Sequence, residues 1–138
     1  LGLKEDNIRL IGNSRNGTYL FNLVHLMKAA EEYDYIYFDG HHTLAVDGPP
    51  AIVSLMMLKE NALISFDDYM WTLRSQLSNI TNSAFYKSMY DISSYTEYEI
   101  NNPHIKILVE DIIANVFNLS AVDEYSTDMW RTFSVSKK

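Results

Sequence analysis

The sequence contains no cysteine, and this absence excludes several kinds of site at once. A chain without thiols has no disulfide framework, no thiolate metal site and no cysteine nucleophile, and its composition leaves the redox compartment undecided. Long hydrophobic runs are missing too, since no apolar stretch approaches the roughly 20 residues that cross a bilayer. We therefore expect a soluble protein with no membrane partner, and a cytoplasmic setting as the default.

Glycine and positive charge are both scarce. Among five glycines no GxGxxG motif occurs, and the loop Gly12–Thr18 has the glycine spacing of a phosphate-binding loop without its lysine. This stretch predicts a loop and not a nucleotide site. Eighteen acidic residues against eleven Lys and Arg give a formal charge of −7. Such a field repels polyanions, so we expect no nucleic acid partner.

The rest of the composition is that of a globular domain. Hydrophobic residues make up 47% of the chain and aromatic residues 13%, and 138 residues suffice for one core. We therefore expect a single domain over residues 1–138. The first ten residues have neither the basic nor the apolar region of a secretory signal, so we expect none.

Alternating strand and helix patterns in the first half predict an α/β fold. Asn7–Ile11 is a β-type run, Thr18–Glu31 has a helical apolar stripe, and Tyr35–Phe38 is apolar on both faces. A helix should follow the prolines at Ala51–Lys59, and a second apolar strand at Leu63–Phe66. Because burial on both faces is typical of central parallel strands, we expect a mostly parallel sheet covered by helices on both sides.

The second half is less regular. Ser75–Asn102 is polar and rich in tyrosine without a sustained period, which predicts helix fragments and a long loop, with 82–102 as a loop or lid insertion. His104–Phe117 returns to helical periodicity. The final segments AVDEYST and WRTFSVS read as two β-runs, so we expect an antiparallel hairpin at the C-terminal end.

Acidic residues follow two of the predicted strands, at the point where each strand ends. Asp39 follows Tyr35–Phe38, and Asp67 and Asp68 follow Leu63–Phe66. Ligands of parallel sheets bind beyond the carboxyl ends of the strands, and clustered carboxylates suit a hard cation such as Mg²⁺ or Ca²⁺. A structural alternative stays open, because Asp is also common as a turn residue and as a helix cap.

Two adjacent histidines follow Asp39. His41 and His42 suit a general base, a metal ligand or exposed loop positions, and neighbouring side chains point in different directions, so we expect one of them at the site. A zinc site is not expected, because His25 and His104 lie far away in sequence and no HxH or HxxxH spacing occurs.

One long stretch resembles a known family. The sequence YIYFDGHHTLAVDGPPAIVSLMMLKENALISFDDYMW resembles the second half of class I S-adenosylmethionine-dependent methyltransferases. It is similar to the branch whose pattern runs roughly fDfiyiDGsHxaxxVxxDaxxxxxLLkxGGxxiFDDYxW, without a gap from Asp39 to Trp71. NIRLIGNSRNGTYLFNL resembles the family's third strand and helix, and NPHIKILVEDIIANVF and WRTFSVSKK resemble its late helix and last strand. The resemblance implies a Rossmann-like three-layer sandwich with strand order 3-2-1-4-5-7-6, of which this chain carries the C-terminal part.

The resemblance also implies a chemistry. Asp39 matches the acid that ends the family's fourth strand, and Asp67 and Asp68 match the pair after the fifth. In metal-using O-methyltransferases of this fold these positions hold a divalent cation such as Mg²⁺, which orients a substrate hydroxyl. His42 matches the family's histidine and is a candidate base beside Asp39. The implied function is methyl transfer from S-adenosylmethionine to the hydroxyl of a small molecule.

The chain departs from this pattern in several places. The family's first two strands, its glycine-rich cofactor loop and the acid that binds the cofactor ribose are missing, so we expect this chain alone to be inactive. Their absence would expose an edge of the strand at Tyr35, which favours pairing with the Asn7 strand or with a second copy in a homodimer. A non-enzymatic binding or assembly module and a metal-dependent hydrolase remain as alternatives. Substitutions relative to the pattern fall at Val46, Asp47, Gly48, Pro50, Asn61 and Ala62.

Overall fold

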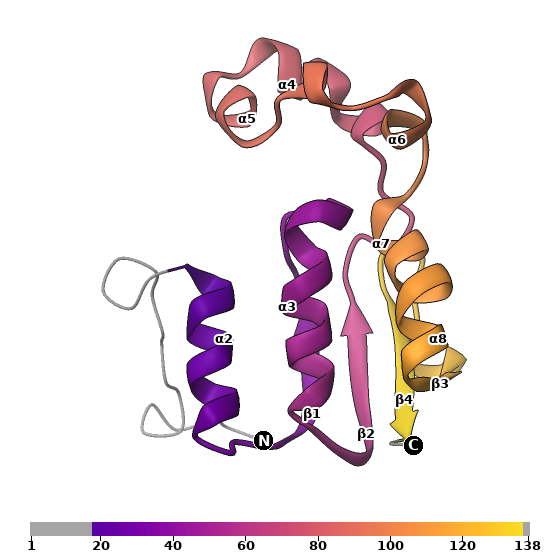
Figure 1. Cartoon of the computed structure of the whole chain (residues 1–138). Helices are drawn as coiled ribbons and strands as arrows, with labels where there is room; N and C mark the ends of the chain where they lie inside the picture. The colour runs from indigo at the N-terminus through magenta and orange to yellow at the C-terminus, as the bar shows by residue number, and fades with distance from the viewer. Residues whose placement is uncertain (1–17, 137–138) are drawn as a thin grey trace, which may run out of the picture.

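The computed structural model of the protein describes residues 18–136, which form a mixed α/β fold (Figure 1). The predicted strand Asn7–Ile11 lies outside the described residues, and so does the predicted loop from Gly12 to position 17. In chain order the elements are α2 (Tyr19–Lys28), β1 (Tyr33–Phe38), α3 (Leu44–Met56), β2 (Leu58–Phe66), α4 (Leu77–Asn82), α5 (Ala84–Met89), α6 (Glu97–Asn101), α7 (His104–Ile107), α8 (Ala114–Val116), β3 (Asn118–Ala121) and β4 (Arg131–Ser136). Short 3₁₀ turns occupy Leu73–Gln76, Ile92–Ser94 and Asp123–Tyr125, and a π-helical stretch, Leu108–Ile113, joins α7 to α8.

The four strands form one sheet in the order β1-β2-β4-β3. β1 and β2 are parallel and in register at Phe38 and Phe66, so their carboxyl ends lie side by side. β4 pairs antiparallel with both β2 and β3, so the described sheet is mixed and not mostly parallel as the sequence predicted. The predicted hairpin is therefore confirmed, but its first strand is Asn118–Ala121. The segment 122–127, expected as part of that strand, contains a 3₁₀ turn at Asp123–Tyr125 instead.

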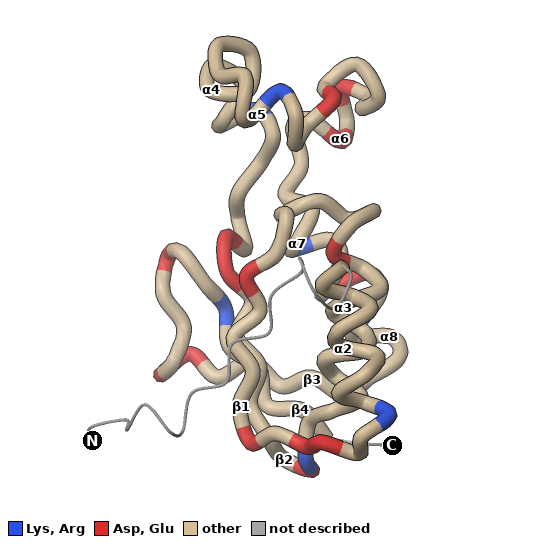
Figure 2. The backbone as a smooth tube through the Cα atoms, turned by 90° about the vertical axis from the view of Figure 1, so that its left-hand side faces the viewer, with Lys and Arg blue, Asp and Glu red and all other residues tan. Residues whose placement is uncertain are grey.

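The expectation of helices on both sides of the sheet is wrong for the described residues, although Ser65 and Thr132 in the middle of the sheet are buried on the face without helices. Helices α2, α3, α7 and α8 all lie on one side of the sheet (Figures 1 and 2). On the other side of β1, Tyr35 and Tyr37 are 50% and 44% exposed, while Phe38 is buried. Tyrosine combines an apolar ring with a hydroxyl that tolerates water, so the apolar run at Tyr35–Phe38 does not require burial on both faces.

The predicted helices exist, but the one expected at Ala51–Lys59 is shifted at both ends, since α3 ends at Met56 and Lys59 belongs to β2. The helix expected over Thr18–Glu31 is α2, whereas α3 begins at Leu44 and not at Ala51. It therefore carries both prolines inside, where each lacks the N–H of a helical hydrogen bond. Burial of Pro50 and Ala51 in the packing of this helix offsets that loss. Within residues 18–136, no helix combines the length and the apolarity needed to cross a bilayer.

The main hydrophobic core lies between the sheet and the helices on its covered face. Phe66 is at its centre, with its ring centroid 5.6 Å from Phe38 and 6.2 Å from Phe133. Leu55 from α3 and Leu108 from the π-helical stretch pack onto the same cluster. This core fixes the ends of β1 and β2 relative to each other and so positions the loops that follow them.

A second, smaller core holds together residues 72–102, which we call the cap. The cap stands above the carboxyl ends of β1 and β2 and contains the short helices α4, α5 and α6 (Figure 1). The segment 82–102, expected as a loop or lid insertion, is thus part of a small helical unit. Its core consists of Leu73, Ile80, Tyr90 and Ile100, with Trp71, Tyr86, Ile92 and Tyr95 packed against them.

A bulge at the start of β2 explains one departure from the family pattern. The register with β1 jumps from Tyr33 opposite Leu58 to Tyr35 opposite Leu63. Asn61 lies within the bulge and has a φ of 59°, a left-handed conformation that favours glycine and in which asparagine is among the best tolerated other residues. Asn61 thus stands where the pattern has glycine without a large conformational cost.

Candidate functional site

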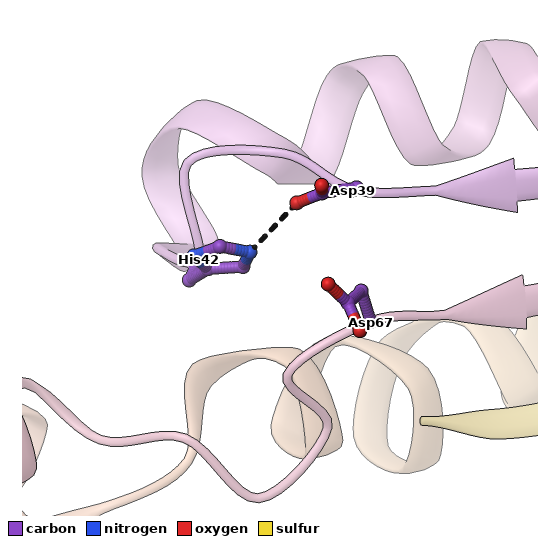
Figure 3. Close-up of side chains that lie close together, drawn as sticks. All are labelled: Asp39, His42 and Asp67. Atoms are coloured by element: carbon purple, nitrogen blue, oxygen red, sulfur yellow. Dashed lines mark hydrogen bonds and ion pairs between the residues drawn. The ribbon is translucent and has the colours of Figure 1, made fainter. Parts of the chain in front are cut away.

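The ends of β1 and β2 bring two acidic residues together. Asp39 and Asp67 directly follow the paired residues Phe38 and Phe66, and the backbone N–H of Asp67 donates to the carbonyl oxygen of Phe38 at 3.0 Å. Because parallel strands end at the same edge of a sheet, both carboxylates lie at this edge (Figure 3). The sequence predicted this proximity for Asp39 and Asp67.

His42 completes a group of three potential ligands. One ligand atom from each of Asp39, His42 and Asp67 lies within 4.8 Å of the others, and the three side chains point toward a common centre (Figure 3). The Nε2 atom of His42 is 3.1 Å from Oδ1 of Asp39. Metal ligation at roughly 2.0–2.6 Å places ligand atoms of one shell about 3–5 Å apart, so these three fit a divalent cation.

Asp68, which the sequence placed in the same metal set, has a different position. Its Oδ2 atom is 3.6 Å from Nδ1 of His42, on the opposite side of the imidazole ring from Asp39. Partial burial raises the pKa of the Asp68 carboxyl, His42 counteracts this, and the nearby Asp67 and Asp39 carboxylates raise the pKa further. The residue has a φ of 47°, so the turn after β2 directs it away from Asp67.

The loop between Asp39 and α3 is held by an acid that sequence reasoning missed. Asp47, in the first turn of α3, is fully buried, and its carboxylate accepts the backbone N–H of His41 at 2.9 Å and of His42 at 2.6 Å. The positive end of the α3 dipole adds to these two bonds in stabilising the buried charge. His42 has a φ of 63° within this loop, so Asp47 fixes an unusual backbone conformation at a candidate ligand.

Gly40 belongs to the same arrangement. A Cβ atom at this position would collide with the Asp47 carboxylate, at 2.6 Å from its Cγ and closer still to Oδ1. The glycine in the DGH sequence is therefore required by space. The reason lies in Asp47, seven residues after Gly40 in sequence, and no motif spacing indicated this contact.

The two histidines have separate roles, as the sequence predicted. The Nε2 atom of His41 lies 3.1 Å from the carbonyl oxygen of Met89 in the cap, and its Nδ1 lies 2.9 Å from Oγ1 of Thr43. A carbonyl oxygen can only accept, so Nε2 carries the proton and Nδ1 accepts from the Thr43 hydroxyl. His41 thus joins the loop to the cap, and His42 alone faces the acids.

Tyr37 orients one of the candidate ligands. Its hydroxyl donates to Oδ1 of Asp67 at 2.7 Å, and this hydrogen bond, with smaller contributions from desolvation and neighbouring charges, raises the pKa of Tyr37 to about 12. Tyr37 is two residues before Asp39 on the exposed face of β1, where its hydroxyl reaches across to β2. Its aromatic character suggested a buried strand and gave no indication of this contact.

We expect Tyr37→Phe to weaken cation binding at the Asp39, His42 and Asp67 group by roughly tenfold, because removal of an outer-shell hydrogen bond typically costs 10- to 100-fold in metal affinity. Titration with Mn²⁺ followed by electron paramagnetic resonance measures the affinity. Tyr35→Phe is the matched control, since Tyr35 lies on the same strand and face and its hydroxyl binds Ser65, 3.1 Å away. Equal affinities of the two variants would contradict the orienting role.

A cavity of about 340 Å³ opens beside this group, between the strand ends and the cap. Its lining includes Gly40, His42 and Asp68 from the strand ends together with Trp71 and the cap residues Tyr86 and Tyr90. Of the group of three potential ligands, His42 is the one that lines this cavity, which is bounded on the cap side by aromatic rings.

The remaining histidines lie elsewhere. His25 is exposed on α2. His104 is buried, its Nδ1 accepts the backbone N–H of Leu44 at 3.1 Å, and its Nε2 is 2.8 Å from the carbonyl oxygen of Glu99. Both ring nitrogens of His104 are thus satisfied with the proton on Nε2, and the residue ties the cap to the start of α3.

Comparison with known proteins adds no identification. No protein-family model matches the chain, and no curated protein sequence matches it. The function must therefore be argued from the site itself.

Proposed function

We propose that this chain forms the methyl-acceptor half of a S-adenosylmethionine-dependent O-methyltransferase, with a divalent cation held by Asp39, His42 and Asp67. The observation that carries the proposal is the convergence of these three ligands at the ends of two adjacent parallel strands. Two carboxylates and an imidazole are a donor set for divalent cations of intermediate hardness, which favours Mn²⁺ over Mg²⁺ or Ca²⁺.

The sheet supports the proposal independently. Its order β1-β2-β4-β3, with only β4 antiparallel to its neighbours, is the order 4-5-7-6 that the family resemblance requires for this part of the chain. The Asp39 and Asp67 positions then correspond to the ends of the family's fourth and fifth strands. Membership of the Rossmann-like methyltransferases is part of the proposal, because strand order alone does not determine activity.

Each residue has a defined task in this function. Asp39 and Asp67 supply anionic oxygen ligands, Tyr37 fixes the rotamer of Asp67, and Asp47 holds the backbone that carries His42. When bound, the cation would lower the pKa of a substrate hydroxyl and hold it in place. The aromatic rings around the cavity limit the access of water to that hydroxyl.

The experiment that tests this proposal measures cation-dependent thermal stability. Mn²⁺ in excess over its dissociation constant should raise the melting temperature, since a ligand that binds only the folded state stabilises it by about 2.7 kcal/mol at a hundredfold excess. The double variant Asp39→Asn with Asp67→Asn should lose this shift, and Asp68→Asn should retain it. Asp34→Asn with Asp111→Asn is the control, because it removes the same charge from two exposed acids, one at the start of β1 and one in the π-helical stretch.

A non-enzymatic role is the competing function, and one contact favours it. His42 lies 3.1 Å from Asp39 and 3.6 Å from Asp68, so a protonated imidazole would neutralise the acids without a cation. In that case the shift in melting temperature caused by Mn²⁺ would be the same in the unsubstituted protein and in the double variant of Asp39 and Asp67. This result would leave a structural salt bridge as the role of the group.

S-adenosylmethionine itself should bind this chain weakly or not at all. The 138 residues contain no glycine-rich cofactor loop after a strand, and a sulfonium cofactor with a ribose needs such a loop and an acidic partner in this fold. Calorimetric titration of the cofactor into the protein measures this. A dissociation constant in the micromolar range would show that this chain holds the cofactor by other means and would overturn the proposed division into two halves.

A further inference from the structure

The cavity beside the acids has the size of a small-molecule site. Its volume of about 340 Å³ lies at the lower end of the range of ligand pockets and suits one ring with a short side chain. It is bounded on one side by His42 and Asp68 at the strand ends and on the other by Trp71 and the cap. His42 connects this space with the group of potential ligands, because it lines the cavity and its Nε2 atom is 3.1 Å from Oδ1 of Asp39.

One wall of the cavity is aromatic and preorganised. The ring centroids of Trp71 and Tyr90 are 5.9 Å apart, and that of Trp71 is 5.5 Å from His42. Tyr90 is only 5% exposed and its hydroxyl donates to the carbonyl oxygen of His41 at 2.9 Å, so its ring has a fixed position. Rings arranged in this way bind flat ligands, and their faces attract cations.

The cavity lining contains one acidic residue, Asp68, whose Oδ2 atom is 3.6 Å from Nδ1 of His42 in the same lining. Asp68 contributes a carboxylate to the lining, and Asp39 is bonded to His42 directly beside it. No Lys or Arg lines the cavity among the residues the structure describes. Carboxylates and phosphates are therefore repelled from this space, whereas a cation gains from both Asp68 and the aromatic faces.

We propose that the cavity between the strand ends and the cap binds a small aromatic amine, with its ring against Trp71 and its ammonium group at the Asp68 carboxylate. This proposal deepens the proposed function and rests on it only in identifying the amine as the methyl acceptor. Asp68 would hold the ammonium group. If the amine is the methyl acceptor, it also carries a hydroxyl, and that hydroxyl would face the Asp39, His42 and Asp67 group. Selection by charge follows from the lining alone and does not depend on methyl transfer.

Three probes of similar size separate the contributions of ring and charge: 2-phenylethylamine, 2-phenylethanol and 3-phenylpropanoate. Each is titrated into the unsubstituted protein at pH 7 without divalent cation or cofactor, and the indole Nε1–H signals of the two tryptophans are followed by ¹H–¹⁵N NMR. Trp71 reports on the cavity. Trp130, whose indole N–H is bonded to the carbonyl oxygen of Tyr125, lines a separate cavity of about 490 Å³, so its signal reports binding of a probe at that other place. We expect the amine to bind roughly tenfold more tightly than the alcohol, and the carboxylate to cause no saturable shift at Trp71.

Substitution of the acid tests the origin of this preference. Asp68→Asn should reduce the preference for the amine over the alcohol to about twofold or less while leaving the affinity for the alcohol unchanged. Asp111→Asn, which removes an exposed acid outside the cavity lining, should preserve the full preference. Melting curves of both variants verify that they fold.

Three results would overturn the inference: equal affinity for amine and alcohol, an amine preference that survives in Asp68→Asn, or no saturable shift at Trp71 with any probe. Because cation and cofactor are left out, these results are independent of the melting experiment on the Asp39 and Asp67 variant. An amine preference together with a negative cation test would mean that the cavity is an amine-binding site without methyl-transfer chemistry.

Discussion

Replacing Asp47 with alanine is expected to lower the free energy of unfolding by about 3 kcal/mol, the largest effect we foresee for a residue outside the hydrophobic core. The carboxylate accepts two backbone N–H groups, from His41 and His42, and it is fully buried. Hydrogen bonds to charged groups contribute about 1.5–3 kcal/mol each. Removal of the Asp47 carboxylate leaves both N–H groups without this partner in a crowded loop. Urea denaturation followed by circular dichroism measures the loss.

Asp47→Asn separates charge from shape at the same position. The amide oxygen can accept one N–H, but the amide NH₂ would face the other N–H as a second donor, so we expect a loss of about 2 kcal/mol. We expect the 2.6 Å bond to the carboxylate to shift the backbone amide signal of His42 downfield, and this signal should move toward random-coil values in both variants. Stability within 0.5 kcal/mol or so of the unsubstituted protein would show that water replaces the carboxylate easily.

A double-mutant cycle with Gly40 makes this prediction specific. Gly40→Ala alone introduces a Cβ that collides with the Asp47 carboxylate, and it should therefore be strongly destabilising. In the Asp47→Ala background the colliding atoms are gone, so the same substitution should cost little. We expect a coupling free energy of at least about 1 kcal/mol between the two sites. Additive losses would mean that Gly40 is required for another reason.

The meeting of Asp39 and Asp67 could be predicted from the sequence because it depends on a few strong signals. Short apolar runs that end in acids mark strand ends, and strand ends of a parallel pair share one edge of the sheet. The proximity of His42, rather than Asp68, to both Asp39 and Asp67 could not be predicted. It depends on left-handed backbone conformations at both residues, which place the His42 ring between Asp39 and Asp68.

Buried polar contacts were the least predictable part. An acid in the first turn of a helix is normally a surface residue that stabilises the helix dipole, and nothing in the pattern around Asp47 distinguishes it from that case. For Tyr35 and Tyr37 the error was the reverse: the hydrophobic rings predicted buried side chains, but both residues are exposed. Their hydroxyls bind Ser65 and Asp67. Hydrophobic periodicity describes which face packs, and it carries no information on which hydroxyl or carboxylate finds a partner.

The cap shows a further limit. Its helices are too short to display a helical period, since α4 and α5 span Leu77–Asn82 and Ala84–Met89. Short helices are marginal in isolation and depend on tertiary contacts, here a cluster around Leu73 and Tyr90. Isolated patterns of this length are therefore indistinguishable from loop in the sequence.

Tyr90→Ala is expected to unfold the cap while the sheet remains folded. Tyr90 is one of the few buried residues of the cap cluster, and truncation of a buried large aromatic residue typically costs about 3–5 kcal/mol. The cap has a small core of its own, so a loss of this size exceeds what its remaining contacts supply. Hydrogen exchange should show protection lost in α4 and α5 and retained in β2.

Two further variants isolate the contribution of the Tyr90 ring to the stability of the cap. One removes only the hydroxyl, and the other removes an exposed aromatic residue of the cap. Burial raises the pKa of Tyr90 to about 12, so the phenol is protonated at neutral pH and donates to the carbonyl oxygen of His41. Tyr90→Phe removes that bond and should cost about 1 kcal/mol with the cap still folded. Tyr98→Ala, at a cap residue that is 69% exposed, should leave protection unchanged. If Tyr98→Ala and Tyr90→Ala gave the same exchange pattern, the cap would not depend on the Tyr90 ring, and the aromatic wall of the cavity would have to be held by the chain entering and leaving the cap.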